Sequence, residues 1–545
     1  MLLESMNMDK WSPFLPVLYA EMHYTLNGFS LIHRHCPEII ADAPHRVEPG
    51  ETVPILILAK DAHRFPVTLL SADVMVIYPD GQSESISLIA EPQDIDAPWW
   101  HTIASIELRE GFIGQLRISV RFRFRRKGKS RIHTAWTDTY PQTSHRPLHV
   151  TIPGDPLPHL PGWLAGDLHV HSDLTSDQAE FGAPLEAIAA LGRAAGLDFA
   201  AVTDHSYDLD DREDDYLKTD QDLGKWKRLH ASISEIDKKD GFVLLPGEEV
   251  SCGNARGRNI HLLLIGQDRF VPGSGDSAER WFRNRPEHSA TEILGGLEPG
   301  ALAFAAHPED NFTWLHRLLL RRGKWQPQDY LHPNLAGMQI LNGVEDAAFQ
   351  KGLDQWIKLL LAGRRLFIAA GNDAHGNFNR FRQLGLPFLT FREADIHLFG
   401  RARTAVFLSE KADRTGILEG LRQGRSVITT GPFLSARIRN ETGNIASIGG
   451  RITGKQLTLQ LEGLSSSEFG PLTSCTVWIG DLTEKRERIV KRICDFSDSF
   501  RWKTNIPLDP TDGPSYIRCR LDAETENKRT FCLTNPIWIQ HTVDA

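Results

Sequence analysis

Hydrophobic and polar positions follow different patterns in successive parts of this 545-residue chain. The first 150 residues contain short apolar or alternating runs, separated by Gly, Pro and Asp, such as "TVPILILAK" and "QLRISVRFRFRR". Alternation with a period of two residues is typical of a strand that buries one face and exposes the other. We therefore predict a β-rich domain of the β-sandwich type over residues 1–150.

The pattern changes at Gly166, after a proline-rich segment (residues 151–165) that predicts a stiff linker. Continuous apolar runs follow, including "DFAAVT", "FVLLPG", "IHLLLIG" and "ALAFAA", as expected of strands that are covered on both faces. Segments with helical periodicity lie between most of these runs, as in "APLEAIAALGRAAG". Strands that alternate with helices predict parallel pairing through crossovers, and hence a (β/α) barrel of the α/β class over residues 166–431.

The last part of the chain, residues 432–545, returns to a strand pattern. Runs such as "QLTLQLEG" and "SYIRCRLDAE" alternate between apolar and polar positions. This pattern predicts a second small β-rich, sandwich-like domain. The complete expectation is a barrel that is flanked by two β domains.

Composition narrows the possible partners and compartments. The chain has 61 basic and 70 acidic residues and a net charge of −9, which disfavours nucleic acid as a partner without excluding it. The six cysteines form no CxxC pair, so neither a zinc knuckle nor a disulfide framework is expected. No signal peptide and no run of 18 uncharged apolar residues is found, so we expect a cytoplasmic protein without a membrane span.

Potential metal ligands stand at the ends of the apolar runs. Active sites of parallel barrels lie where strands meet the following loops, so this regular placement predicts a multinuclear metal site. His169 and His171 are two residues apart, which places both imidazoles on the same face of a strand. The complete set of candidate ligands is His169, His171, Asp177, His205, Glu249, His261, His307, Asp373 and His375.

Some of these residues also have simpler interpretations. His261 lies inside an apolar run and could be a hydrogen-bonded core histidine. Asp373 and His375 lie in "GNDAHGN", which is rich in residues that favour turns. Glu249 follows a buried strand, where a free carboxylate is costly unless it is paired or bound to a metal, whereas Glu248 faces the opposite way. Mixed imidazole and carboxylate ligands suit two or three divalent Zn, Mn or Fe ions.

Six segments carry a resemblance to a known family. They are "GDLHVHSDLTSD", "AVTDHS", "PGEEVS", "NIHLLLIG", "AFAAHPED" and "GNDAHG". In order and spacing they resemble the polymerase-and-histidinol-phosphatase (PHP) superfamily of metallohydrolases. The flanking segments "GRSVITTGPF" and "LTNPIWI" are similar to the carbaryl-hydrolase-like branch of that superfamily.

The resemblance implies a distorted, TIM-like (β/α)7 barrel with up to three metal ions. It assigns His169, His171, Glu249 and Asp373 to the first ion. The second ion would share Glu249 and add His261 and His307, and the third would use Asp177, His205 and His375. Asp204 is expected to orient an imidazole from behind the ligands.

We therefore hypothesise a metal-dependent hydrolase in which a metal-bridging hydroxide attacks a small-molecule phosphomonoester or phosphodiester. The catalytic groups would be His169, His171, Glu249, Asp373 and His375. The alternatives are a carboxyl or carbamate ester hydrolase of the carbaryl-hydrolase-like type and a non-catalytic, metal-containing protein that binds a glycan or another protein.

Specificity is less readable from the sequence. Three arginines are candidate contacts for a substrate anion, although each could also be a solvated loop residue. They are Arg256, Arg258 and Arg380. Residues 266–300 predict a lid or rim that offers Trp281 and Phe282 for contact. The sequence leaves the oligomeric state open.

Overall fold

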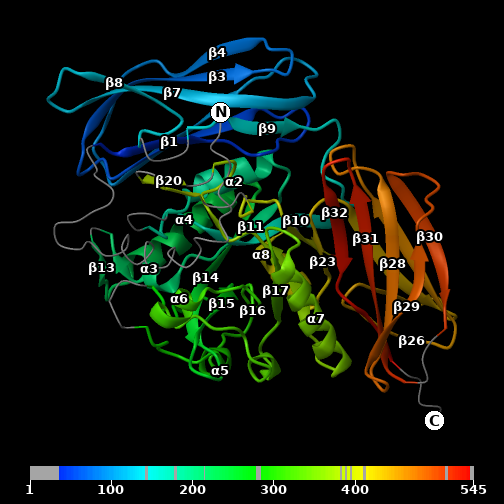
Figure 1. Cartoon of the computed structure of the whole chain (residues 1–545). Helices are drawn as coiled ribbons and strands as arrows, with labels where there is room; N and C mark the ends of the chain where they lie inside the picture. The colour runs from blue at the N-terminus through cyan, green and yellow to red at the C-terminus, as the bar shows by residue number, and fades with distance from the viewer. Residues whose placement is uncertain are drawn as a thin grey trace.

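The computed structural model describes most of the chain, and Asp177, Trp281 and Phe282 lie outside the described residues. The described ranges are 36–140, 145–176, 181–213, 215–277, 284–380, 383–386, 389–392, 396–408, 413–509 and 513–540. Figure 1 shows the N-terminal strands in blue above the central part, with the C-terminal strands in orange and red beside it.

The N-terminal strands form two antiparallel sheets. One sheet has the order β1-β2-β6, and the other has the order β4-β3-β7-β8, with β5 paired to β3 and β9 paired to β7. In β7, Leu116 and Phe122 are buried while Arg121 and Arg123 are exposed, as the alternating sequence predicted. The bounds are β1 (Glu38–Asp42), β2 (Val53–Lys60), β3 (Val67–Ile77), β4 (Ser83–Ile89), β5 (Gln93–Ile95), β6 (Trp99–Ile106), β7 (Gly114–Arg126), β8 (Ile132–Trp136) and β9 (Leu148–Ile152).

The central strands belong to one long mixed sheet. Its order is β18-β17-β16-β15-β14-β11-β10-β22-β23, and β19 pairs with β10. The bounds are β10 (Trp163–His171), β11 (Phe199–Val202), β14 (Val243–Gly253), β15 (Asn259–Ile265), β16 (Leu302–Ala305), β17 (Gly337–Asn342), β18 (Phe367–Gly371), β19 (Ala374–His375), β22 (Arg403–Phe407) and β23 (Ser426–Thr429). Two small hairpins complete the strands of this part: β12 (Asp211–Arg212) with β13 (Asp215–Thr219), and β20 (Gln383–Leu386) with β21 (Leu389–Arg392).

The predicted (β/α)7 barrel of the α/β class is wrong. Strands make up 44% of the structure and helices only 14%, so the protein is mostly β. The central sheet is mixed, because β14 pairs with β15, and β15 with β16, in antiparallel fashion. Only residues 254–258 connect β14 to β15. A connection this short makes a hairpin, whereas a parallel pair needs a crossover of about a dozen residues or more.

Helices are few, and several begin at a capping side chain. Asp346 and Asp413 accept hydrogen bonds from backbone N–H groups at the starts of α7 and α8, and Ser289 forms a capping box with Glu292 in α5. Gly196 has a φ of 87° just past α2, where a left-handed residue ends a helix. The bounds are α2 (Leu185–Ala194), α3 (Ser206–Leu209), α4 (Gly224–Asp240), α5 (Ala290–Gly295), α6 (Trp314–Leu319), α7 (Ala347–Leu361), α8 (Arg414–Arg422) and the 3₁₀ turn η3 (Asp329–Leu331).

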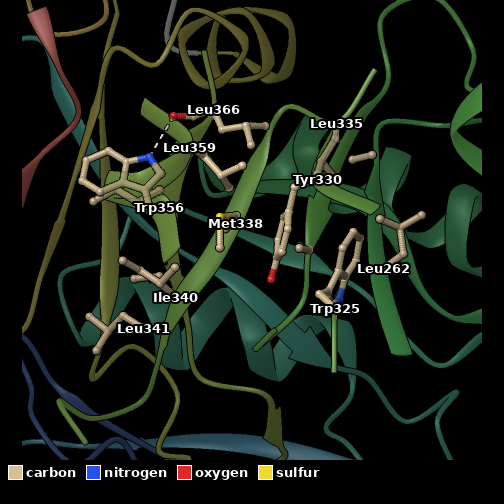
Figure 2. Packing of buried hydrophobic residues seen from close by; sticks show 14 of the residues in the cluster. Leu262, Trp325, Tyr330, Leu335, Met338, Ile340, Leu341, Trp356, Leu359 and Leu366 are labelled. Atoms are coloured by element: carbon tan, nitrogen blue, oxygen red, sulfur yellow. Dashed lines mark hydrogen bonds between the residues drawn. The ribbon is translucent and has the colours of Figure 1, made fainter. Parts of the chain in front are cut away.

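Helix α7 anchors a large apolar core beside the central sheet. Its Trp356 is fully buried and donates a hydrogen bond from Nε1 to the Leu366 carbonyl oxygen at 2.9 Å (Figure 2). Leu262 of β15 and Met338 of β17 belong to the same buried cluster. This packing holds the strands from which the site residues project. Within the described part of the chain, no helix is both long and apolar enough to cross a membrane.

The C-terminal strands extend the central sheet and add a second one. The order continues from β23 through β32-β31-β28-β29, while β25-β24-β27-β30 form a separate antiparallel sheet. One apolar core joins residues of both sheets. The bounds are β24 (Phe433–Asn440), β25 (Ile445–Ser447), β26 (Arg451–Thr453), β27 (Leu457–Leu464), β28 (Leu472–Asp481), β29 (Arg486–Ile493), β30 (Arg501–Leu508), β31 (Ser515–Glu524), β32 (Arg529–Thr534) and β33 (Ile537–Gln540).

Candidate metal centre

Eight of the nine predicted ligands lie in the described residues, and the central sheet brings them together. Strand β10 carries His169 and His171, and its parallel pairing with β19 places His171 opposite His375. A β-bridge joins His205, just after β11, to Glu249 of β14. The remaining members come from β15, from the end of β16 and from the turn between β18 and β19: His261, His307 and Asp373.

The ligand-type atoms of these side chains form three overlapping groups. Within each group the atoms all lie within 4.8 Å of one another. The groups are His169, His171, Glu249 and Asp373; Glu249, His261 and His307; and His171, His205 and His375. The first two contain the same residues as the first two sets that the resemblance implies. In the third group, His171 accompanies His205 and His375, while Asp177 is outside the described residues.

Glu249 occupies the centre of the cluster and is 1% exposed. Its Oε1 atom lies 2.5 Å from His261 Nδ1 and 3.1 Å from His307 Nε2. Its Oε2 atom lies 3.1 Å from His205 Nδ1 and 3.3 Å from His169 Nε2. The two oxygens therefore face different groups, which is the arrangement of a carboxylate that bridges two cations.

These separations test whether the residues fit a metal ion. Nitrogen and oxygen ligands bind zinc at about 2.0–2.2 Å, so two ligands of one tetrahedral ion lie roughly 3.3–3.6 Å apart. The 3.3 Å between Glu249 Oε2 and His169 Nε2 and the 3.6 Å to His171 Nε2 match that spacing. Among the described residues, no donor hydrogen-bonds Glu249 Oε2, although the atom is buried. The donor set therefore fits divalent cations.

Asp373 reaches the cluster from a strained turn. Its Oδ1 lies 3.1 Å from His171 Nε2 and 3.3 Å from His169 Nε2. The φ angle of Asp373 is 53°, and that of His307 is 26°, both in the left-handed region that side chains rarely adopt. Such conformations cost about 1–3 kcal/mol and are found mainly where function requires a fixed direction.

Electrostatics keep the carboxylates of the cluster charged. Burial would raise the pKa of Glu249, but His261 and His169 hold the pKa well below its usual value. Burial opposes the ionisation of Asp373 as well, yet its pKa is also well below the ordinary value because of His169 and His171. Burial would lower the pKa of His169, but the charges of Asp373 and Glu249 raise it to about 9. Burial and the nearby His375 keep the pKa of His171 well below its usual value.

Three polar side chains behind the cluster fix the outer nitrogens of its histidines, and the sequence analysis missed all three. His169 Nδ1 lies 2.9 Å from Gln339 Oε1. His307 Nδ1 lies 3.1 Å from Asp310 Oδ2, and His261 Nε2 lies 3.1 Å from Asp276 Oδ2. Acceptors placed in this way hold each imidazole so that its other nitrogen faces the cluster. Two of them left a signal, because Asp310 ends "HPED" and Gln339 interrupts the apolar "GMQILN".

Asp276 is buried beside a charged partner. Its side chain is fully buried and receives hydrogen bonds from Ser251 and an ion pair from Arg322, whose Nε lies 2.5 Å from Asp276 Oδ2. Burial would raise the pKa of Asp276, but Arg322 and His261 hold it well below the usual range. Arg322 therefore keeps a charged acceptor behind His261.

Asp204 acts differently from the prediction. Its carboxylate accepts hydrogen bonds from the backbone N–H and hydroxyl of Ser172 and from those of Thr175. The Thr175 hydroxyl in turn lies 3.4 Å from His171 Nδ1 and 3.3 Å from the His205 backbone nitrogen. Asp204 thus positions Thr175, and its influence on the imidazoles is indirect.

The three predicted anion contacts occupy other environments. Arg256 and Arg258 are exposed on the turn between β14 and β15, and Arg258 Nη1 donates to the Arg317 carbonyl oxygen at 3.0 Å. Arg380 is 5% exposed and forms an ion pair with Asp138 of the N-terminal part at 3.0 Å. The side chain of Arg380 thus ties two parts of the chain together. This structural role corrects the expected substrate contact, because a buried guanidinium needs a charged partner.

A cavity of about 370 Å³ opens beside His307. Its lining includes Asp310, Phe312, His316, Phe349 and His397. His397 is oriented by a 2.8 Å hydrogen bond between its Nδ1 and the Asn372 carbonyl oxygen. The cavity adjoins the group that contains Glu249, His261 and His307, so it has room for a molecule that reacts there.

Comparisons with known proteins add little. No protein-family model and no curated protein matches the chain. Trypsin-activated α-2-macroglobulin from Escherichia coli aligns at 10% identity over 95% of this chain and 25% of its own, with a TM-score of 0.15. A β-glucuronidase from Parabacteroides merdae aligns at 10% identity over 93% of this chain and 65% of its own, with a TM-score of 0.16. The chain thus spans less than two thirds of either protein, and likenesses this weak carry no argument.

Proposed function

We propose that this protein is a metal-dependent hydrolase that acts on ester bonds, with a small phosphomonoester or phosphodiester as its substrate. One observation carries the proposal: eight ligand-type side chains converge in three overlapping groups. Glu249 belongs to two of these groups, and His171 also belongs to two. The resemblance of the strand-end motifs to PHP metallohydrolases supports the same class of reaction. The proposal rests on the side-chain cluster and not on the barrel that this resemblance implied.

The three groups would each hold one divalent cation, of the Zn, Mn or Fe type. When bound, the cations would supply a lowered pKa for a water molecule and a positive field for the negative charge that develops on the substrate. The protein's own contribution is orientation. Gln339, Asp310 and Asp276 hold the imidazoles of His169, His307 and His261, so that the ligand nitrogens keep fixed positions during turnover.

The shape of the site favours a phosphoester over a carboxyl ester. A phosphoryl group presents several oxygen atoms, and three adjoining groups of ligands can balance more negative charge than one. The cavity beside His307 would take the leaving group, because it adjoins the cluster and combines apolar side chains such as Phe312 and Phe349 with polar ones. Its volume of about 370 Å³ suits a small molecule.

Metal analysis of the purified chain, combined with hydrolysis assays, tests the proposal. We expect two or three metal ions per chain and chelator-sensitive cleavage of bis-p-nitrophenyl phosphate or p-nitrophenyl phosphate. His169→Ala should lose metal and abolish turnover. Cleavage of p-nitrophenyl acetate alone would replace the phosphoesterase by a carboxyl or carbamate ester hydrolase. A chain that stays free of metal after reconstitution with Mn, Zn and Fe would overturn the hydrolase proposal and favour a binding protein.

A further inference from the structure

A second group of charged side chains lies where the N-terminal, central and C-terminal parts of the chain meet. Arg46 follows β1, Arg401 and Arg403 lie at the start of β22, and Lys528 precedes β32. We call these four residues the basic junction. Arg46 is 2% exposed and Arg403 is 3% exposed, so two guanidinium groups are buried here, while Lys528 is exposed. Buried cations are costly unless partners of opposite charge surround them.

The carboxylates around the junction are mostly committed to Arg46. Its Nη1 lies 2.8 Å from Glu48 Oε1, and its Nη2 lies 3.1 Å from Glu468 Oε2. Arg403 and Lys528 both contact the aromatic ring of the next residue, Phe469. The guanidinium carbon of Arg403 and the ammonium nitrogen of Lys528 each lie 5.5 Å from the ring centroid. A buried guanidinium and an exposed ammonium group therefore lie against the same aromatic ring.

Arg403 is incompletely satisfied in this environment. Its Nη1 donates to the Gly400 carbonyl oxygen at 3.1 Å. Its Nη2 is buried and, within the described part of the chain, has no hydrogen-bond partner. The hydroxyl of Ser466, two residues before Glu468, is likewise buried without a partner in that part. A buried donor without a partner is rare in folded proteins, so the Nη2 of Arg403 indicates a missing acceptor.

The pKa values of two side chains at the junction are lowered as well. Burial, Arg46 and Lys528 lower the pKa of the neighbouring His45 to about 3. Partial burial and repulsion from Arg401 and Arg403 lower the pKa of Lys528 to about 8. Burial is the largest cause of both shifts, and the neighbouring positive charges add to it. A bound anion would offset those neighbouring charges.

We propose that the basic junction binds a small tetrahedral oxyanion, of the inorganic phosphate or sulfate class, between Arg403 and Lys528. A guanidinium recognises such an anion through directed, charge-assisted hydrogen bonds, and the ammonium group contributes from the solvent side. The anion ties together residues of all three parts of the chain. This site is separate from the metal centre and does not depend on the proposed hydrolase activity.

Isothermal titration calorimetry of the full chain with inorganic phosphate tests the site. The protein is first treated with a chelator, so that no metal ion can bind the phosphate, and ionic strength is held constant with chloride. We expect one phosphate per chain, and the same binding with sulfate. Lys528→Gln should weaken binding at least fivefold without disturbing the fold, because this side chain is exposed. Lys503→Gln is the matched control, since Lys503 of β30 pairs with Glu462 of β27, and it should bind like the unaltered chain.

A second measurement protects the test against a variant that loses affinity for an unrelated reason. Phosphate should raise the melting temperature of the unaltered chain and of Lys503→Gln, and raise that of Lys528→Gln by less. Equal affinity of Lys528→Gln and the unaltered chain would overturn the proposal. So would the absence of binding at 10 mM phosphate, or binding that occurs only when metal ions are present, because the anion would then belong to the metal centre.

Discussion

The metal centre and the basic junction are both buried and charged, yet their polar atoms are satisfied in opposite ways. In the metal centre, the outer nitrogens of His169, His261 and His307 each face a fixed acceptor, and the atoms that remain point inward at one another. In the basic junction, the Nη2 of Arg403 is buried without a hydrogen-bond partner in the described part of the chain, and Arg46 is a cationic neighbour. These two arrangements lead to opposite expectations: cations at the metal centre and an anion at the junction.

The largest test of this comparison removes the shared carboxylate of the metal centre. Glu249→Gln keeps the size of the side chain and removes its charge, so two of the three groups lose their common ligand. We expect loss of metal ions and a fall in hydrolysis of at least about 1000-fold, equivalent to roughly 4 kcal/mol of transition-state stabilisation. Metal analysis and steady-state kinetics measure both effects.

The neighbouring Glu248 is the matched control. It is buried on the opposite face of β14, where it accepts a hydrogen bond from Ser206, and burial raises its pKa well above the usual value. Glu248→Gln keeps the size of the side chain, and Glu248 belongs to none of the three groups, so the metal content and rate of this variant should match those of the unaltered chain. If Glu249→Gln were equally active, the proposed role of the cluster would be wrong.

A smaller effect is expected behind the metal centre. Asp276→Asn removes the charge that faces His261 Nε2 and Arg322, so His261 loses its fixed orientation. We expect metal affinity to fall by about 10- to 100-fold. Competition with a chromophoric chelator measures it, and Asp268→Asn, at a 96% exposed site, serves as the control. Unchanged affinity in Asp276→Asn would show that Asp276 has no influence on the ligand.

The smallest effect concerns the stability of the basic junction at low pH. The pKa of His45 is about 3 in the folded chain and about 6.5 in an unfolded one. Between these two pH values the unfolded state binds more protons than the folded state. His45 therefore lowers the free energy of unfolding as the solution is acidified below about 6.5. At pH 5 the loss should be about 1–2 kcal/mol relative to pH 7, because His45 keeps some contact with solvent.

Chemical denaturation of the unaltered chain and of His45→Gln at pH 5 and pH 7 isolates this contribution. The variant should lose less stability on acidification, and the difference between the two proteins cancels the effect of the other histidines. An identical loss in both proteins would mean that His45 takes up its proton in the folded state. Burial and the neighbouring cations would then not hold the pKa of His45 low in the folded chain.

The ligands of the metal centre were predictable because each one ends an apolar run or stands two residues from another. Two of their partners were less so, because Gln339 and Asp276 do not belong to the segments that carry the histidines. Asp276 is 15 residues from His261 and lies in a segment without a clear pattern. Arg380 shows the same limit: its partner Asp138 is 242 residues away, and no local feature of the sequence distinguishes a buried arginine from a solvated one.

The fold was predicted least well where pairing direction matters. The apolar runs that became β14, β15 and β16 were correctly interpreted as buried strands, since all their core positions are covered. Their hydrophobicity says nothing about the direction of a neighbouring strand. The turn at residues 254–258 held the relevant information, because Asn254 accepts hydrogen bonds from the backbone of Arg256 and Arg258 and reverses the chain.

The pairing of β23 with β32 has a consequence for how this protein could be divided or recombined. A chain that stopped at residue 431 would leave β23 with an open backbone edge, only one strand away from β22 and two from β10, which carries His169 and His171. Such an edge invites pairing with other chains. The C-terminal strands are therefore not an exchangeable module: any shortened or shuffled version must bring its own replacement for β32.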